Sequence, residues 1–190
     1  MNDITPLLPR RSVPDLSVRL APDGTPFRLV EERPEHFTLV LFYRGLHCPV
    51  CRGQLRDLES KLDAFAARGI GVVAVSSDDA ERAARAKAEW ELPRLRLGYG
   101  LTPEAARSWG LYLSAGHGTS SNGVEEPDLF SEPGLFLVRP NGELYFASVQ
   151  TMPFARPALS DLLGGLDFVI PRNYPARGEI VTLAEARTAA

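Results

Sequence analysis

The sequence predicts an α/β fold in which a central mixed β-sheet is flanked by helices on both faces. An apolar run at residues 37–43 is apolar on both of its faces, so this strand should lie inside a sheet that is covered on both sides. Downstream of this run, strand-like and helix-like patterns alternate, which is typical of parallel strands joined by helices. A Pro140-Asn141-Gly142 turn between two apolar runs predicts a β-hairpin, whose antiparallel strands would make the sheet mixed.

Each element has its own signal, in chain order. Residues 16–30 alternate apolar and polar positions around an Asp23-Gly24 turn, which predicts an N-terminal β-hairpin. Apolar residues spaced by three and four predict one helix from Pro49 to Gly69. The remaining predicted elements are a strand at 70–75, a helix at 78–90 with capping-box spacing between Asp78 and Glu81, a strand at 95–99, a helix at 102–110, an irregular loop at 114–132, a hairpin at 135–149 and a helix at 157–170.

Length and composition fit one soluble globular domain. The chain has 190 residues, of which 44% are hydrophobic and 24% are charged. Its net charge is only -3, without a basic stripe, so we expect neither nucleic acid nor a membrane surface as a partner. The N-terminus lacks the apolar core of a signal peptide, which favours a cytoplasmic protein. We expect an N-terminal arm at 1–12, a folded domain at 13–170 and a C-terminal tail at 171–190.

The two cysteines of the chain form a Cys48-Pro49-Val50-Cys51 motif between the central strand and the first helix. Two thiols at this spacing can close a disulfide with little movement, and free amides at a helix N-terminus favour the thiolate. If Cys48 is the N-cap, it should be an exposed nucleophile. Cys51 lies on the apolar stripe of the helix, so it should be shielded and act second. The motif therefore predicts a redox-active dithiol.

A zinc site, a haem attachment site and a structural disulfide each fit the motif less well. A closed zinc site needs four ligands, but the chain offers only the two thiols and three scattered histidines, so we expect no metal. Haem attachment would require a histidine directly after Cys51, where the chain has Arg52. A purely structural disulfide closing so short a loop would stabilise the fold by only about 2 kcal/mol.

Several neighbours of the dithiol are candidates for supporting roles. His47, Arg44 and Arg52 would lower a thiol pKa if they turned toward the sulfurs, although each is as readily an ordinary surface side chain. In this topology the segment after the second hairpin returns to the dithiol side of the sheet. Its residues are candidates for a substrate wall, or else pack on the last helix. They are Thr151, Met152 and Phe154.

The order of elements, with CxxC at the first strand-helix junction, resembles the thioredoxin fold. More closely, the segments FYRGLHCPVC, SSDD and PGLFLVRPNGELYFASVQ resemble the peroxiredoxin-like branch of the alkyl hydroperoxide reductase and thiol-specific antioxidant family. The resemblance covers about residues 13–170. It implies a cysteine-dependent oxidoreductase that binds no cofactor and is reduced by an external thioredoxin-, glutaredoxin- or glutathione-like thiol.

The chain departs from the pattern of this family at the active site. The family carries P-x-x-x-T-x-x-C, and counting back from Cys51 places Cys48 at the threonine and Arg44 at the proline. Pro133 stands where the family has an arginine that polarises peroxide. Thioredoxins and glutaredoxins hold a cis-proline at the position of Pro133, and their CPxC motif resembles the dithiol of this chain. The resemblance therefore implies dithiol chemistry, with Pro133 beside the sulfurs.

Three functions are consistent with these features. The first is a thiol-disulfide oxidoreductase with an antioxidant role, in which Cys48 attacks and Cys51 resolves. The second is a hydroperoxide reductase with Cys51 as the peroxidatic and Cys48 as the resolving cysteine. The third is a noncatalytic redox sensor or binding module. The expected partners are a disulfide or hydroperoxide substrate and a reducing protein or small thiol, and the sequence leaves a homodimer open.

Overall fold

The computed structural model describes residues 4–182, which form a mixed α/β fold. The strands are β1 (Ser17–Ala21), β2 (Thr25–Arg28), β3 (Phe37–Phe42), β4 (Ile70–Val75), β5 (Leu97–Tyr99), β6 (Leu113–Ala115), β7 (Leu129–Ser131), β8 (Gly134–Val138) and β9 (Leu144–Val149). The helices are α1 (Pro49–Ser60), α2 (Leu62–Ala66), α3 (Ala80–Glu89), α4 (Pro103–Ser108) and α5 (Leu159–Val169), with a 3-10 turn at Leu29–Glu31.

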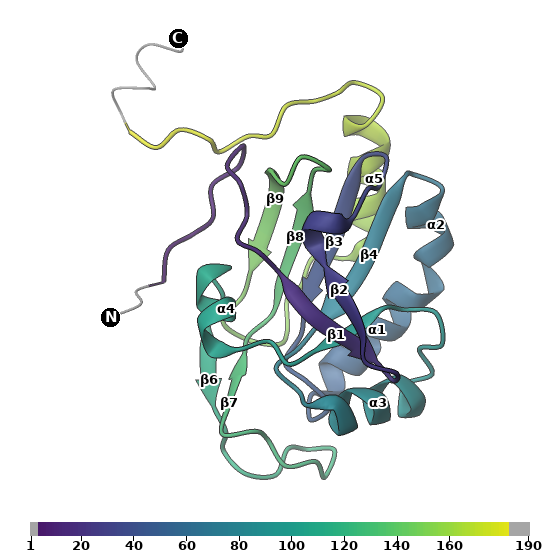
Figure 1. The fold of residues 1–190 in the computed structure, drawn as a ribbon, viewed down its shortest axis with the longest axis vertical. Coiled ribbons are helices and arrows are strands. Elements are labelled where there is room, and N and C mark those ends of the chain that lie inside the picture. The colour runs from purple at the N-terminus through teal and green to yellow at the C-terminus, as the bar shows by residue number, and fades with distance from the viewer. Residues whose placement is uncertain (1–3, 183–190) are drawn as a thin grey trace.

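Seven strands form one mixed sheet in the order β2-β1-β5-β4-β3-β8-β9 (Figure 1). Strands β3, β4 and β5 are parallel, as expected for strands joined by helices. Strand β8 is antiparallel to β3, and β9 is antiparallel to β8. At the opposite edge, the β1–β2 hairpin pairs antiparallel with β5. The predicted mixed sheet and N-terminal hairpin are therefore both confirmed.

The central strand β3 is buried along its whole length and contributes to a core on each face of the sheet. Leu39 and Leu41 belong to the core under α1, α2, α3 and α5, whereas Val40 and Phe42 belong to the core under α4. This alternation follows from the two-residue period of a strand. Figure 1 shows α4 on one side of the sheet and α1, α2, α3 and α5 on the other. Trp90 lies in the first core and Trp109 in the second, as expected for structural side chains.

Three details of the secondary structure differ from the prediction. The helix expected from Pro49 to Gly69 is divided at Lys61, whose φ of -106° and ψ of 2° leave the helical region. The N-cap of α3 is Asp79 rather than Asp78, because the Asp79 side chain accepts a hydrogen bond from the Arg82 N–H. The predicted loop at 114–132 contains most of a small antiparallel sheet, formed by β6 and β7.

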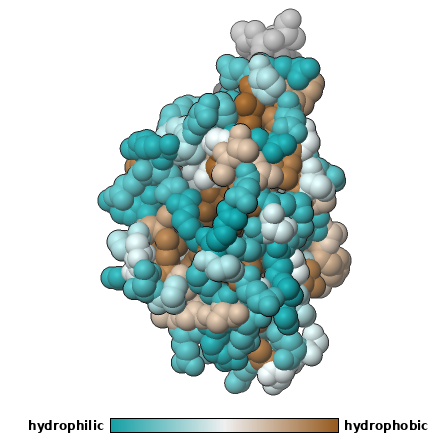
Figure 2. All heavy atoms as spheres, turned by 90° about the vertical axis from the view of Figure 1, so that its right-hand side faces the viewer, coloured by the Kyte–Doolittle hydropathy of each residue, from teal (hydrophilic) through white to brown (hydrophobic). Residues whose placement is uncertain are grey.

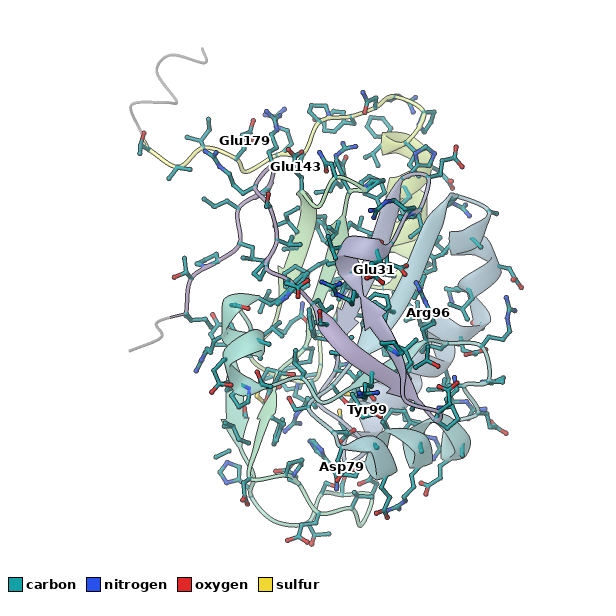
Figure 3. All side chains as sticks on the ribbon, in the orientation of Figure 1. Glu31, Asp79, Arg96, Tyr99, Glu143 and Glu179 are labelled. Atoms are coloured by element: carbon teal, nitrogen blue, oxygen red, sulfur yellow. The ribbon has the colours of Figure 1, made fainter. Side chains whose placement is uncertain are left out.

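Segments near both ends of the described chain meet beside the β8–β9 hairpin. The Arg10 N–H donates to the Leu144 carbonyl, and the Leu144 N–H donates to the Arg11 carbonyl. The Arg10 side chain also bonds the Ala176 carbonyl and pairs with Glu179, which lies near Glu143 in Figure 3. Residues 1–3 of the predicted arm and 183–190 of the predicted tail lie outside the described residues.

The surface seen in Figure 2 is mainly hydrophilic, with apolar groups interspersed among polar ones. Across residues 4–182, the helices are too short or too polar for any of them to span a lipid bilayer.

Candidate active site

The Cys48-Cys51 dithiol lies at the N-terminus of α1, directly after the loop that follows β3. Cys48 is the N-cap, with extended backbone angles of -100° and 104°, and its Sγ accepts a hydrogen bond of 3.2 Å from the Cys51 N–H. Pro49 is the first helical residue, a position where its missing N–H costs no helical hydrogen bond. The sequence thus places one sulfur against the free amides of the helix and the other one turn inside.

Both sulfurs are buried in the reduced protein. Cys51 has no exposed surface, as its place on the apolar stripe predicts, and Cys48 is only 1% exposed. The expectation that Cys48 is exposed is therefore wrong. A side chain from the loop after β9 lies against both sulfurs, since Arg156 Nη2 is 3.9 Å from the Cys48 Sγ and 3.2 Å from the Cys51 Sγ, and Cys48 also belongs to the core on this face of the sheet.

The two thiols have opposite electrostatic environments. The pKa of Cys48 is lowered to about 6, first by a hydrogen bond from the Cys51 thiol and further by the Cys51 N–H and the positive charges of Arg156 and Arg44. Burial raises the pKa of Cys51 well above its usual value, and the adjacent Cys48 sulfur raises it further. At neutral pH the dithiol therefore holds its negative charge on Cys48.

Arg156 is the main site residue that the sequence analysis missed. Its Nη1 donates a hydrogen bond to Gln54 of α1, which holds the guanidinium beside the sulfurs. The preceding residue, Ala155, has a left-handed backbone with φ of 57°, a conformation that costs an alanine free energy. One signal was available, because Arg156 is a charged residue only two positions after the segment 150–154 that was expected to return to the dithiol.

Of the three residues expected to form a substrate wall, only Phe154 lines a pocket with Arg156. Phe154 lines a pocket of about 420 Å³ together with Arg156 and residues of α1 that include Val50 and Gly53. Phe154 and Val50 are both exposed, so the pocket has an apolar rim. Thr151 and Met152 are exposed and are not among the residues that line this pocket.

Arg44 belongs to a partly buried cluster that joins the active-site loop to β7 and its flanking residues. Its guanidinium lies 4.7 Å from the Phe130 ring centroid, and its nitrogens lie 3.5 Å from Glu126 and 3.6 Å from Glu132. The Arg44 charge contributes to the low pKa of Cys48. Arg52, by contrast, is exposed and is not among the groups that shift either thiol pKa.

Pro133 is buried directly before β8, and its peptide bond with Glu132 is trans. Among residues 4–182, the cis peptide bond is the one between Ala21 and Pro22. The Pro133 carbonyl accepts a hydrogen bond of 3.0 Å from the Gln150 N–H, so the segment after β9 does begin beside Pro133. The site therefore lacks the cis-proline that thioredoxins and glutaredoxins hold at this position.

His47 is 1% exposed, and its ring lies 4.6 Å from the Phe130 ring. Its pKa is lowered from 6.5 to about 4, first because burial disfavours the charged ring and then because Arg44 is positive. The unfolded chain therefore takes up a proton at a higher pH than the folded protein. We expect the free energy of unfolding to fall by about 3 kcal/mol through His47 as the pH drops from 6.5 to 4.

Urea unfolding at several pH values measures this contribution in the variant His47→Leu. The variant should lose less stability than the wild type over this pH range, whereas His117→Asn, at an exposed site, should follow the wild type. Equal pH slopes for His47→Leu and the wild type would contradict a buried neutral histidine.

A reduced dithiol with one ionised sulfur, one protonated sulfur and an adjacent arginine can exchange two electrons with a substrate. Within residues 4–182, no group of three or more His, Cys, Asp or Glu residues is arranged to hold a metal ion. The fold and this pair of sulfurs define a thioredoxin-like, cysteine-dependent oxidoreductase.

Comparison with known proteins identifies the family. Residues 9–147 match the model of the AhpC/TSA family, so the chain belongs to this family. The family consists of cysteine-dependent peroxidases with antioxidant function, which confirms the predicted class of enzyme. Its members need no prosthetic group. A search of curated proteins found no match.

Solved structures confirm the fold. The peroxidoxin BcpB of Mycobacterium tuberculosis has a TM-score of 0.65 at 18% identity, and the match covers 85% of this chain and 97% of that chain. The reduced 2-Cys peroxiredoxin of Plasmodium vivax has a TM-score of 0.69 at 16% identity, with coverage of 88% and 84%. AhpC of Mycobacterium tuberculosis has a TM-score of 0.65 at 17% identity, with coverage of 89% and 96%.

Proposed function

We propose that this protein works by cycling Cys48 and Cys51 between a dithiol and a disulfide, with Cys48 as the attacking sulfur. The observation that carries the proposal is the hydrogen bond of 3.2 Å from the Cys51 N–H to the Cys48 Sγ. This bond stabilises a thiolate on Cys48 but not on Cys51. The positions of Arg156 and Arg44 support the same assignment, because their charges also lower the pKa of Cys48.

With a hydroperoxide, the Cys48 thiolate attacks one peroxide oxygen and the O–O bond breaks. The alkoxide leaves and takes up a proton, while Cys48 becomes a sulfenic acid. Cys51 then attacks the Cys48 sulfur as its proton leaves, and water is released as the disulfide forms. With a disulfide substrate, Cys48 first forms a mixed disulfide, and Cys51 displaces the second substrate thiol. Both routes oxidise the dithiol by two electrons.

The opposite assignment, with Cys51 as the attacking cysteine, has one observation in its favour. Arg156 Nη2 is nearer to the Cys51 Sγ than to the Cys48 Sγ, at 3.2 Å against 3.9 Å. If Cys51 were the peroxidatic cysteine, this guanidinium would stabilise its thiolate and Cys48 would resolve. Burial opposes this assignment, since it raises the pKa of Cys51.

The proposal includes a reductant and an assembly. We propose that an external thioredoxin-, glutaredoxin- or glutathione-like thiol reduces the disulfide, since the cycle itself consumes the dithiol. We also propose a homodimer, because β9 ends the sheet order and thus offers an edge for pairing with a second copy. Sedimentation velocity of the reduced protein would detect the dimer, and a monomer at all concentrations would exclude it.

The cycle can be tested directly by oxidation with one equivalent of hydrogen peroxide. Trypsin cleaves after Arg44 and Arg52, so both sulfurs fall in the single peptide 45–52. We expect this peptide to lose two hydrogen atoms and to regain them on treatment with a thiol reductant. Oxidation to sulfinic acid without any disulfide, or disulfides only between two chains, would refute the proposal.

A further inference from the structure

A buried carboxylate from the connection between β4 and α3 lies against the loop that carries the dithiol. Asp78 is 1% exposed, and its Oδ2 accepts hydrogen bonds of 2.9 Å from the Leu46 N–H and 3.2 Å from the Ser76 hydroxyl. Its Oδ1 accepts a bond of 2.9 Å from Arg82 Nε. The sequence pattern favours Asp78 as the helix cap, but the residue that caps α3 is Asp79, which is labelled in Figure 3. The structure therefore leaves Asp78 without a role in starting the helix.

We propose that Asp78 is a positioning residue for the Cys48 nucleophile, holding the loop between β3 and α1 in the turn that places Cys48 at the helix N-cap. The hydrogen bonds of Asp78 go to Leu46, Ser76 and Arg82 rather than to either sulfur, so it acts through the loop. This inference rests on the proposed assignment of Cys48 as the attacking sulfur.

The connection from Asp78 to Cys48 runs through two hydrogen bonds that backbone N–H groups of the loop donate. Asp78 fixes the N–H of Leu46, and the turn then closes with a bond of 3.0 Å from the Cys48 N–H to the Gly45 carbonyl. From the other side, Asn122 Nδ2 donates to the Leu46 carbonyl at 3.3 Å. The peptide groups on both sides of Leu46 are thus held, and in this arrangement of the turn the Cys48 Sγ accepts its hydrogen bond of 3.2 Å from the Cys51 N–H.

Gly45 shows how closely the carboxylate fits this loop. Its φ is 134°, in a region that side chains disfavour, and a Cβ built there would lie 2.7 Å from Asp78 Oδ1. The loop therefore requires glycine at this position so that the backbone can approach the carboxylate. This close contact between the Asp78 carboxylate and the Gly45 backbone is expected if Asp78 fixes the turn.

Arg82 allows the carboxylate to stay ionised in this buried place. Burial raises the pKa of Asp78, and the adjacent guanidinium of Arg82 opposes that rise. The ionised group can accept from all three donors at once. In Asp78→Asn the amide would turn its N–H groups toward either Arg82 Nε or the Leu46 N–H, which places two donors face to face. The variant should therefore release the loop.

The test uses the background Cys51→Ser, in which Cys48 is the only thiol. The rate of iodoacetamide alkylation is measured against pH, and its midpoint reports the pKa of Cys48. With Asp78→Asn, we expect the midpoint to rise by about one pH unit or more as Cys48 loses the N-cap position. Asp79→Asn is the matched control, because it removes the same charge from the adjacent residue and keeps a side chain that caps helices well.

The outcomes separate this inference from the proposed function. A midpoint near the ordinary thiol value in the parent would refute the assignment of Cys48, whatever Asp78 does. A low midpoint in the parent that does not move in folded Asp78→Asn would overturn the positioning role, even if thermal stability falls. Should Asp78→Asn not fold, Ser76→Ala removes one donor from the carboxylate. It should raise the midpoint by a smaller amount, and an unchanged midpoint would equally overturn the inference.

Discussion

Replacing Cys48 with serine should abolish turnover of both hydroperoxides and disulfides. Cys48 carries the thiolate at neutral pH, whereas burial raises the pKa of Cys51 and leaves it protonated. A serine hydroxyl cannot replace the thiolate as a nucleophile or hold a disulfide. Stopped-flow measurement of peroxide consumption, with a thiol reductant in excess, should show at least about a 10³-fold loss of rate.

Cys51→Ser is the matched variant and should fail at a different step. Its Cys48 thiolate still attacks, so the first turnover should be fast and leave a sulfenic acid or a trapped mixed disulfide detectable by mass spectrometry. The opposite pattern would contradict the assignment. If Cys48→Ser kept rapid peroxide consumption while Cys51→Ser lost it, Cys51 would be the peroxidatic cysteine.

Replacing Arg156 with methionine should have the next largest effect. The variant keeps an apolar side chain of similar length but loses the guanidinium that lies 3.2 Å and 3.9 Å from the two sulfurs. Removing a positive charge beside a thiolate raises its pKa, so we expect the pKa of Cys48 to rise by about one unit. Loss of a donor at the reacting centre should also lower kcat/KM by about 10²-fold.

Two further variants serve as controls for Arg156. Arg52→Met removes an exposed arginine of α1 and should leave kcat/KM within about twofold of the wild type, since exposed charges act weakly. Arg156→Lys keeps the charge without the planar pair of donors and should recover part of the rate. If Arg156→Met behaved like Arg52→Met, the guanidinium would have no part in the reaction.

The layered fold could be predicted because its signals are local and regular. The apolar run at β3 and the helical spacing after Pro49 follow from burial on both faces of a sheet and on one face of a helix. The dithiol could be predicted equally well, because the CxxC motif is recognised from two cysteines and from their position between a strand and a helix. These features depend on neighbours in the sequence.

The features that the sequence did not predict depend on contacts between distant segments. Arg156 lies 105 residues from Cys51 in the chain, and its approach requires the left-handed turn at Ala155. The burial of Cys48 likewise depends on distant segments, since Cys48 belongs to the core under α1, α2, α3 and α5. The sequence pattern favours Asp78 as the cap of α3, whereas the structure places Asp79 there. Only the folded loop shows that the Asp78 carboxylate faces the Leu46 N–H instead. Spacing alone cannot distinguish such alternatives.

The pH dependence of Cys48 alkylation in Cys51→Ser tests the central claim most directly. The claim is that the N-terminus of α1 and its nearby cations ionise Cys48 in the folded protein. In this variant the Cys51 thiol no longer donates to Cys48, and the remaining Cys51-position N–H, Arg156 and Arg44 should still hold the midpoint below the free thiol value, with reactivity constant above the midpoint and falling below it. A midpoint near the free thiol value of about 8.5, together with a lower one for Cys51 in Cys48→Ser, would contradict the claim.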